Sequence, residues 1–112
     1  MSIRVYRSDL YKTWHRDLSV KDKRVVDARI DIVRSFNVLS NYKQLDKECA
    51  LYEFKWNSGL RVYFALLSDR DGRFILLLIG GNKNTQANDI VTAKKIILRA
   101  IAGVKNKGEK DE

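Results

Sequence analysis

The chain is predicted to form an α+β fold. The expected order is an N-terminal strand and two helices, a mostly antiparallel sheet of three to four strands, and a C-terminal helix. Apolar residues recur at helical spacing over residues 9–36 and 85–101, and they alternate with polar residues over residues 52–67. Short turns at Asn57-Ser58-Gly59 and Asp69–Gly72 are typical of β-hairpins. The helices are therefore expected on one side of the sheet, leaving the other face partly polar.

The first third of the chain predicts one strand and two helices. Ile3–Tyr6 alternates apolar and basic residues, as a short half-buried strand does, and Asp9 is expected to cap the first helix. That helix would carry Leu10, Trp14 and Leu18 at helical spacing. A longer helix should begin at Ser19 or Asp22 and end in a break at residues 37–41. Its broad apolar face comprises Val25, Val26, Ile30, Ile32, Val33 and Phe36.

The middle of the chain predicts the sheet. Over residues 52–56, Tyr52, Phe54 and Trp56 share one face, while Glu53 and Lys55 share the other. Residues 60–67 alternate in the same way, with Arg61 and Tyr63 on one face. The segment Phe74–Ile79 is apolar on both faces, which predicts the central strand.

The end of the chain predicts one more helix. It should start near Thr85 and bury Ile90, Ala93, Ile97 and either Ala100 or Ile101. Residues 1–102 are predicted to form a single domain. Residues 103–112 are charged and contain glycine, so a disordered tail is expected there.

Composition limits the classes of function. The 112 residues include 22 Lys and Arg against 14 Asp and Glu, a net charge of +8 that favours polyanionic partners. With one cysteine and one histidine, the chain can build neither an intrachain disulfide nor a zinc cluster, so no metal or cofactor is expected. No apolar run approaches the roughly 18 residues that span a bilayer, which predicts a cytoplasmic protein.

The strand faces and the Gly80-Gly81-Asn82-Lys83 loop together suggest a site for phosphates. Alternation makes neighbours of the polar side chains on adjacent strands, which are Glu53, Lys55, Arg61 and Tyr63. The loop should lie beside them, where a helix begins, and helix N-termini favour anions. Gly80-Gly81 is expected to leave the strand with unusual backbone angles.

Four segments resemble a known family. They are Tyr52–Lys55, Gly59–Phe64, Leu76–Gln86 and Asp89-Ile90, and the specific part of the resemblance is residues 52–90. They resemble the phage-derived, HigB-like addiction-module killer branch of the RelE/ParE toxins. The resemblance implies a RelE-like fold and a type II toxin that cleaves translated mRNA in the ribosomal A site. In that reaction the ribose 2′-hydroxyl attacks the adjacent phosphate. The implied partners are the ribosome, mRNA and a cognate antitoxin, typically a helix-turn-helix protein.

The resemblance also implies roles for individual residues. Arg61 would hold the scissile phosphate, Lys55 would serve proton transfer or charge stabilisation, and Lys83 would contact phosphate from the loop. Tyr63 would stack on RNA or carry a proton. The remaining candidates are Gln86, Lys94 and Lys95 as RNA contacts, and Glu53 and Asp89 as acid or base.

Simpler interpretations of the same residues stay open. Arg61 could form a salt bridge with Glu53, Lys83 could be an ordinary loop lysine, and Asp89 could cap the last helix. At the level of function, one alternative is a ParE-like inhibitor of DNA gyrase that has the same fold without RNase chemistry. The other is a non-enzymatic basic module that binds RNA or protein.

Overall fold

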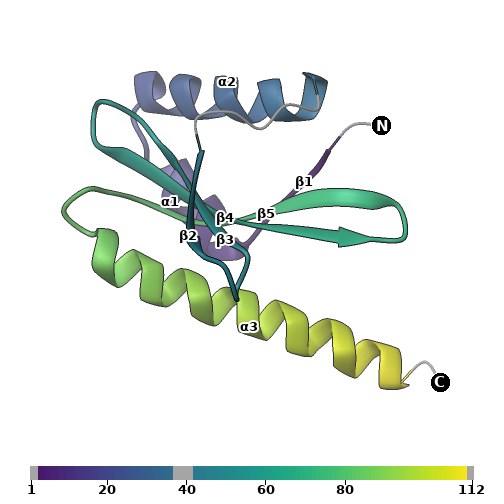
Figure 1. Ribbon diagram of the computed structural model, residues 1–112. Coiled ribbons are helices and arrows are strands. Elements are labelled where there is room, and N and C mark those ends of the chain that lie inside the picture. The colour runs from purple at the N-terminus through teal and green to yellow at the C-terminus, as the bar shows by residue number, and fades with distance from the viewer. Residues whose placement is uncertain (1–2, 37–41, 111–112) are drawn as a thin grey trace.

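The chain folds into a five-stranded mixed sheet with helices on both faces (Figure 1). The computed structural model describes residues 3–36 and 42–110, with side chains as far as Ala102. The elements, in chain order, are β1 (Arg4–Arg7), α1 (Asp9–Arg16), α2 (Val20–Phe36), β2 (Tyr42–Asp46), β3 (Leu51–Lys55), β4 (Leu60–Asp69), β5 (Gly72–Asn82) and α3 (Gln86–Lys110). The α+β class and the RelE-like element order are therefore as predicted. The break predicted at residues 37–41 lies outside the described residues.

The sheet has more strands than the sequence predicted. Its order is β1-β5-β4-β3-β2, so β4 is the middle strand, and the prediction that Phe74–Ile79 is central was wrong. β5 is apolar on both faces because it is an inner strand between β1 and β4. β2 was missed because its sequence, Tyr42-Lys43-Gln44-Leu45-Asp46, is largely polar. An exposed edge strand needs no apolar alternation.

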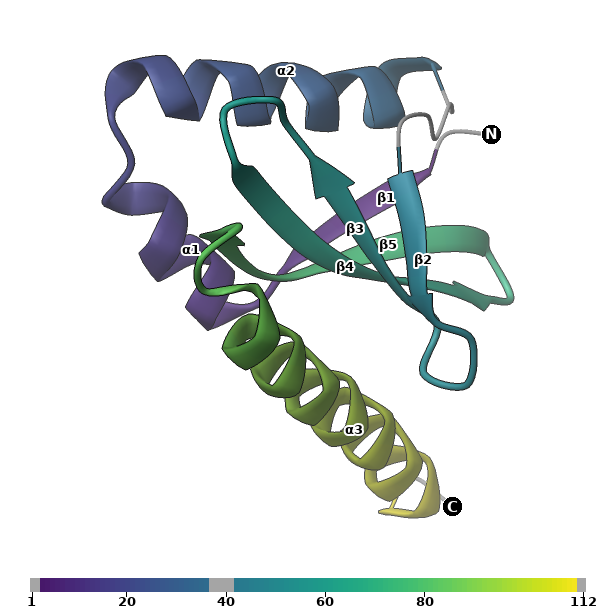
Figure 2. The same ribbon diagram turned by 60° about the vertical axis from the view of Figure 1, so that its left-hand side comes forward.

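Both faces of the sheet are covered, which corrects the prediction that the helices lie on one side. Figures 1 and 2 show α2 and α3 on opposite sides of the strands. Tyr11 of α1 and three residues of α2 pack with Phe54, Val62 and Phe64. On the other face, Ala93 and Ile97 of α3 pack with a second set of strand residues, which are Leu51, Tyr63, Ala65 and Leu78. The face expected to be partly polar is thus a second core.

Serine hydroxyl groups cap the N-termini of the first two helices. The Ser8 hydroxyl accepts a hydrogen bond from the backbone N–H of Tyr11 at 3.1 Å, so Ser8, and not Asp9, caps α1. The Ser19 hydroxyl accepts from the backbone N–H of Asp22, also at 3.1 Å. Of the two starts proposed for α2, the structure selects Ser19.

The apolar face of α2 is only partly buried. Val26, Ile30 and Val33 are at most 2% exposed, as predicted. Ile32 and Phe36 remain 46% and 71% exposed, because only one side of a helix can meet the sheet. Part of the predicted α2 core is therefore surface.

The last helix is longer than predicted. α3 continues through Gly103 as far as Lys110, where a disordered tail was expected. A glycine inside a helix costs only about 1 kcal/mol, and the segment has no proline to stop the helix. The division of the chain at residue 102 stays a prediction. None of the described helices is both long enough and apolar enough to cross a bilayer.

Candidate functional site

Strand register brings the predicted polar side chains together. In the β3–β4 pair, Glu53 lies opposite Tyr63, and Lys55 lies opposite Arg61. Arg61 in turn lies opposite Gly81 of β5. Residues directly opposite each other have Cβ atoms about 5 Å apart, so these side chains are neighbours, as predicted.

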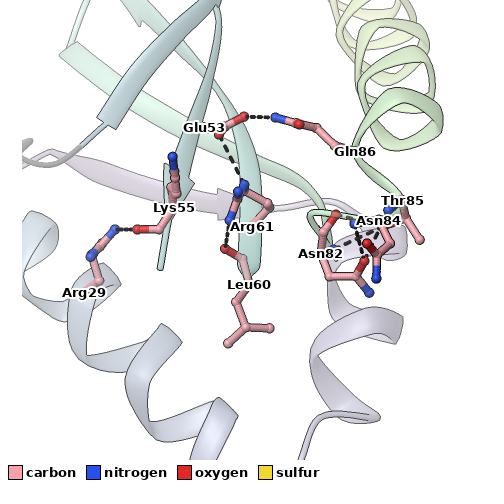
Figure 3. Close-up of polar contacts among 9 residues, drawn as sticks. All are labelled: Arg29, Glu53, Lys55, Leu60, Arg61, Asn82, Asn84, Thr85 and Gln86. Atoms are coloured by element: carbon pink, nitrogen blue, oxygen red, sulfur yellow. Dashed lines mark hydrogen bonds and ion pairs between the residues drawn. The ribbon is translucent and has the colours of Figure 1, made fainter. Parts of the chain in front are cut away.

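Arg61 is held rigidly. Its residue surface is 8% exposed, and its Nε lies 3.4 Å from Oε1 of Glu53. This distance defines an ion pair. The Nε–H group nevertheless does not point at the carboxylate closely enough to donate a hydrogen bond to it. Nη1 donates to the carbonyl of Leu60 at 3.1 Å (Figure 3). Nη2 makes no hydrogen bond with the described residues.

Glu53 is a buried carboxylate with two partners. It is 2% exposed and lies between Arg61 and Gln86, whose side-chain amide donates to Oε2 at 3.0 Å (Figure 3). A buried carboxylate requires such compensation, because removing it from water is costly. Glu53 therefore orients Arg61, and Gln86, predicted to contact RNA, orients Glu53 from the first turn of α3.

The loop before α3 is fixed by its own side chains. The Asn82 carbonyl Oδ1 accepts from the backbone N–H groups of Asn84 and Thr85, at 2.8 and 3.2 Å. The Thr85 hydroxyl accepts from the Asn82 N–H and donates to the carboxylate of Asp89. Asp89 is 8% exposed, and its contacts favour the capping interpretation over a role as acid or base.

Gly81 lets α3 begin close to the sheet. A Cβ atom at this position would lie 1.9 Å from Oδ2 of Asp89 and 2.7 Å from Oγ1 of Thr85. A side chain at this position would displace the Asp89 carboxylate and the Thr85 hydroxyl, and so disturb the hydrogen bond between them.

Two exposed lysines lie at the same end of the sheet. Lys55 faces Arg61 across the strand pair. Lys83 donates its backbone N–H to the carbonyl of Gly59 at 3.0 Å, which sets it against the β3–β4 turn. The end of the sheet thus combines one buried guanidinium with two exposed ammonium groups, a set suited to charge-assisted bonds with phosphate oxygens.

Tyr63 has no polar partner. It is fully buried, and its hydroxyl makes no hydrogen bond with the described residues. Burial first, and then the nearby Glu53 and Asp89 carboxylates, raise the pKa of Tyr63 well above its usual value near 10. The phenol therefore stays protonated at neutral pH, and its position favours packing over proton transfer.

Replacing Tyr63 with phenylalanine is expected to leave activity intact. The change removes a buried hydroxyl without a partner, so stability should stay constant or rise by up to about 1 kcal/mol. Urea unfolding and a toxicity assay on expression would measure the two effects. A large loss of toxicity in a folded Tyr63→Phe protein would instead give the hydroxyl a role in the chemistry.

The other two predicted RNA contacts lie further along α3. Lys94 is eight residues beyond Gln86, about 12 Å along the helix axis. Its Nζ lies 3.0 Å from Oδ2 of Asp46, and this contact raises the pKa of Lys94. Lys95 is exposed on the next position. The structure does not bring these lysines to the Arg61 cluster.

Sequence reasoning missed Arg29. Its Nη1 donates to the carbonyl of Lys55 at 3.0 Å (Figure 3). Its guanidinium carbon lies 4.3 Å from the ring centroid of Trp56. This contact ties α2 to the end of β3. Nothing in the sequence distinguishes Arg29 from the other charged residues of α2.

Solved structures share this architecture. The chain resembles a mutant of the Escherichia coli toxin RelE in the free state, with a TM-score of 0.59 and 14% identity over 84% of this chain and 95% of that one. It also resembles the toxin–antitoxin complex RelBE2 from Mycobacterium tuberculosis, with a TM-score of 0.50 and 13% identity over 73% of this chain and 99% of that one.

These likenesses define the class of fold. The protein is an α+β domain with the RelE toxin fold, in which a buried arginine–glutamate pair lies beside the start of the last helix. No protein-family model and no curated protein sequence matches the chain.

Proposed function

We propose that this chain is the toxin of a type II toxin–antitoxin system, of the HigB-like branch, and that it acts as a ribosome-dependent mRNA endonuclease. The observation that carries the proposal is the setting of Arg61. It is held by Glu53 and Leu60, its Nη2 makes no hydrogen bond within the described part of the chain, and it lies beside the exposed Lys55. The shared fold with RelE and with the RelBE2 toxin–antitoxin complex supports a toxin with an antitoxin partner. The proposed location is the cytoplasm, where ribosomes and mRNA are found.

The resemblance to RelE-type toxins implies the reaction, and the positions of these residues suggest their roles in it. The 2′-hydroxyl of one ribose attacks the adjacent phosphorus, which gives a cyclic phosphate and expels the 5′-oxygen of the next nucleotide. Arg61 binds a non-bridging oxygen and stabilises the charge that develops there. Lys55 is the exposed side chain closest to Arg61 along the strand pair, so it serves proton transfer or further charge stabilisation. Lys83 holds a neighbouring phosphate.

The buried carboxylates have supporting roles in this proposal. Glu53 positions Arg61, and Asp89 fixes the start of α3 through Thr85. The basic surface of the protein adds sequence-independent attraction to ribosomal RNA, which weakens as salt rises.

Controlled expression in a bacterial host tests the proposal. Primer extension on a translated message should reveal new 5′ ends inside codons, and these ends should vanish when translation of that message is blocked. Growth arrest without such ends would contradict the nuclease and support a gyrase inhibitor, for which DNA supercoiling would be measured. Normal growth with soluble protein would leave only a non-enzymatic binding module.

A further inference from the structure

Large apolar side chains are exposed along one side of α3. Val91, Leu98 and Ile101 are 52%, 60% and 43% exposed, and Ala87, one turn before Val91, is exposed as well. Each residue of an α-helix turns by about 100°, so these four residues lie within an arc of about 80°, called the α3 stripe below. Figures 1 and 2 show the strands along another side of the helix. Exposed apolar side chains that line up in this way mark a surface for interaction with another molecule.

The spacing of the α3 stripe is that of a contact between helices. With Lys94 included, its residues follow one another at intervals of four, three, four and three positions. Alternating intervals of three and four are typical of the seam along which two helices pack. An extended peptide repeats its side chains every two residues and would not match them. The α3 stripe is therefore suited to the apolar edge of another helix.

The charged side chains beside the α3 stripe are all basic. Lys94, Lys95 and Arg99 lie next to it, whereas Asp89, the one acid between residues 86 and 102, is buried and bonded to the Thr85 hydroxyl. Among the residues whose side chains the structure describes, no ion pair involves Lys95 or Arg99. The positive charge on this side of α3 is therefore not balanced within the described part of the chain.

Apolar and basic side chains together select one kind of partner. A second copy of the chain would bring the lysines of one stripe against those of the other, and like charges across an interface oppose binding. RNA would contact Lys95 and Arg99 but would leave Val91 and Leu98 without a role. An amphipathic helix with acidic flanks uses both kinds of side chain.

We propose that the α3 stripe binds an acidic amphipathic helix of a partner protein. The apolar edge of that helix packs on Val91, Leu98 and Ile101, and its carboxylates pair with Lys95 and Arg99. The inference goes beyond the proposed function, because neither Arg61 nor RNA cleavage enters it.

A designed peptide tests the inference. The probe is a fluorescent three-heptad peptide with leucine at the two seam positions of each heptad. Glutamates at the flanking positions keep it from pairing with itself. The control peptide has the same composition in an order that forms no apolar edge. Fluorescence anisotropy should show that the patterned peptide binds the protein about tenfold more tightly, or better, than the control peptide.

Matched double variants locate the binding surface. Val91→Ser with Leu98→Ser should weaken binding of the patterned peptide about tenfold or more, because two apolar contacts are lost. The control, Ile32→Ser with Phe36→Ser, makes the same kind of change at exposed positions of α2 and should bind like wild type. Circular dichroism should show that both variants keep their helices, since none of the four side chains is buried.

Charge reversal tests the flank of the stripe. Lys95→Glu with Arg99→Glu should also weaken binding about tenfold, and it should make the remaining binding less sensitive to salt. Lys21→Glu with Arg24→Glu makes the same change in net charge at exposed positions of α2 and should have a much smaller effect.

Three results would overturn the inference. One is equal binding of the two peptides, or equal weakening in the α3 and α2 variants, which would show attraction to net charge alone. The second is binding of an oligouridine that requires Lys95 and Arg99 in a protein that does not bind the peptide, which would assign the surface to RNA. The third is a dimer of the free protein, seen by analytical ultracentrifugation, that Val91→Ser with Leu98→Ser abolishes.

These outcomes are separate from those of the proposed function. The peptide requires neither the ribosome nor Arg61. A toxin that cleaves its message and does not bind the peptide would reject this inference alone, whereas a protein that binds the peptide and cleaves no message would reject only the nuclease.

Discussion

Replacing Arg61 with alanine is expected to abolish toxicity and the new 5′ ends in translated mRNA. The guanidinium is preorganised, since Glu53 and the Leu60 carbonyl hold it in one geometry. Losing one such preorganised donor costs about a hundredfold or more in rate. Growth after induction and primer extension on a translated message would measure the loss.

The same change should also destabilise the protein. Arg61→Ala leaves the Glu53 carboxylate buried without its cation, and breaking a buried pair on one side costs about 3 kcal/mol or more. An inactive protein could then simply be an unfolded one. Adding Glu53→Gln removes the orphaned charge and keeps an amide that can bond Gln86, so the double variant should recover much of the stability in urea. It should remain non-toxic.

The double variant therefore separates chemistry from folding. Stability restored together with toxicity would show that Arg61 matters only as the partner of Glu53. Stability restored without toxicity would assign Arg61 to the phosphate. Arg61→Lys adds a third comparison, because an ammonium keeps the charge but loses the planar fork that satisfies Leu60 and a phosphate together.

Local sequence patterns predicted which residues would be neighbours. Period-two alternation placed Glu53, Lys55, Arg61 and Tyr63 on one face, and the observed register pairs them in that way. A slip of one residue would have reversed every side chain, so this part of the prediction was specific. The Arg61–Glu53 pair was predicted there as an alternative to a functional role. In the structure the pair forms, and Nη2 of Arg61 makes no hydrogen bond with any residue that the structure describes.

The burial of this cluster could not be predicted in the same way. The apolar face of α3 indicates that the helix packs on something, but not on which face of the sheet. Only the tertiary fold reveals that Ala93 and Ile97 cover Tyr63, and that Gln86 reaches Glu53 from 33 positions away. Long-range contacts of this kind leave no local period in a sequence. For the same reason, nothing in the sequence indicated the contact between Arg29 of α2 and the carbonyl of Lys55.

The Gly80-Gly81 pair is important for the structure, but the reason differs from the one predicted. Its glycines were expected to adopt unusual backbone angles. The described glycines with positive φ are instead Gly59 and Gly72, in the two hairpin turns. At Gly80 and Gly81 the missing Cβ provides space, on opposite faces of β5: for Trp14 on one side and for Asp89 on the other.

Gly80→Ala is therefore expected to destabilise the protein strongly. A Cβ atom there would lie 2.2–2.3 Å from three ring atoms of Trp14, well inside van der Waals contact. The indole packs against the core between α1 and β5, so it has little room to retreat. Overpacking of this severity should lower the free energy of unfolding by about 3 kcal/mol, at the upper end of its usual cost. Urea denaturation followed by circular dichroism would measure the change.

A second substitution tests whether this contact is the cause. Trp14→Leu should itself destabilise the protein by leaving a cavity, but it removes the ring that the new methyl group strikes. If steric overlap explains the effect, the combined loss in Gly80→Ala/Trp14→Leu will be smaller than the sum of the two separate losses, as expected for coupled neighbours. Strictly additive losses would mean that Gly80 is needed for a reason other than Trp14. The requirement for glycine at position 80 would then come from the backbone of β5 and not from the packing of α1 against it.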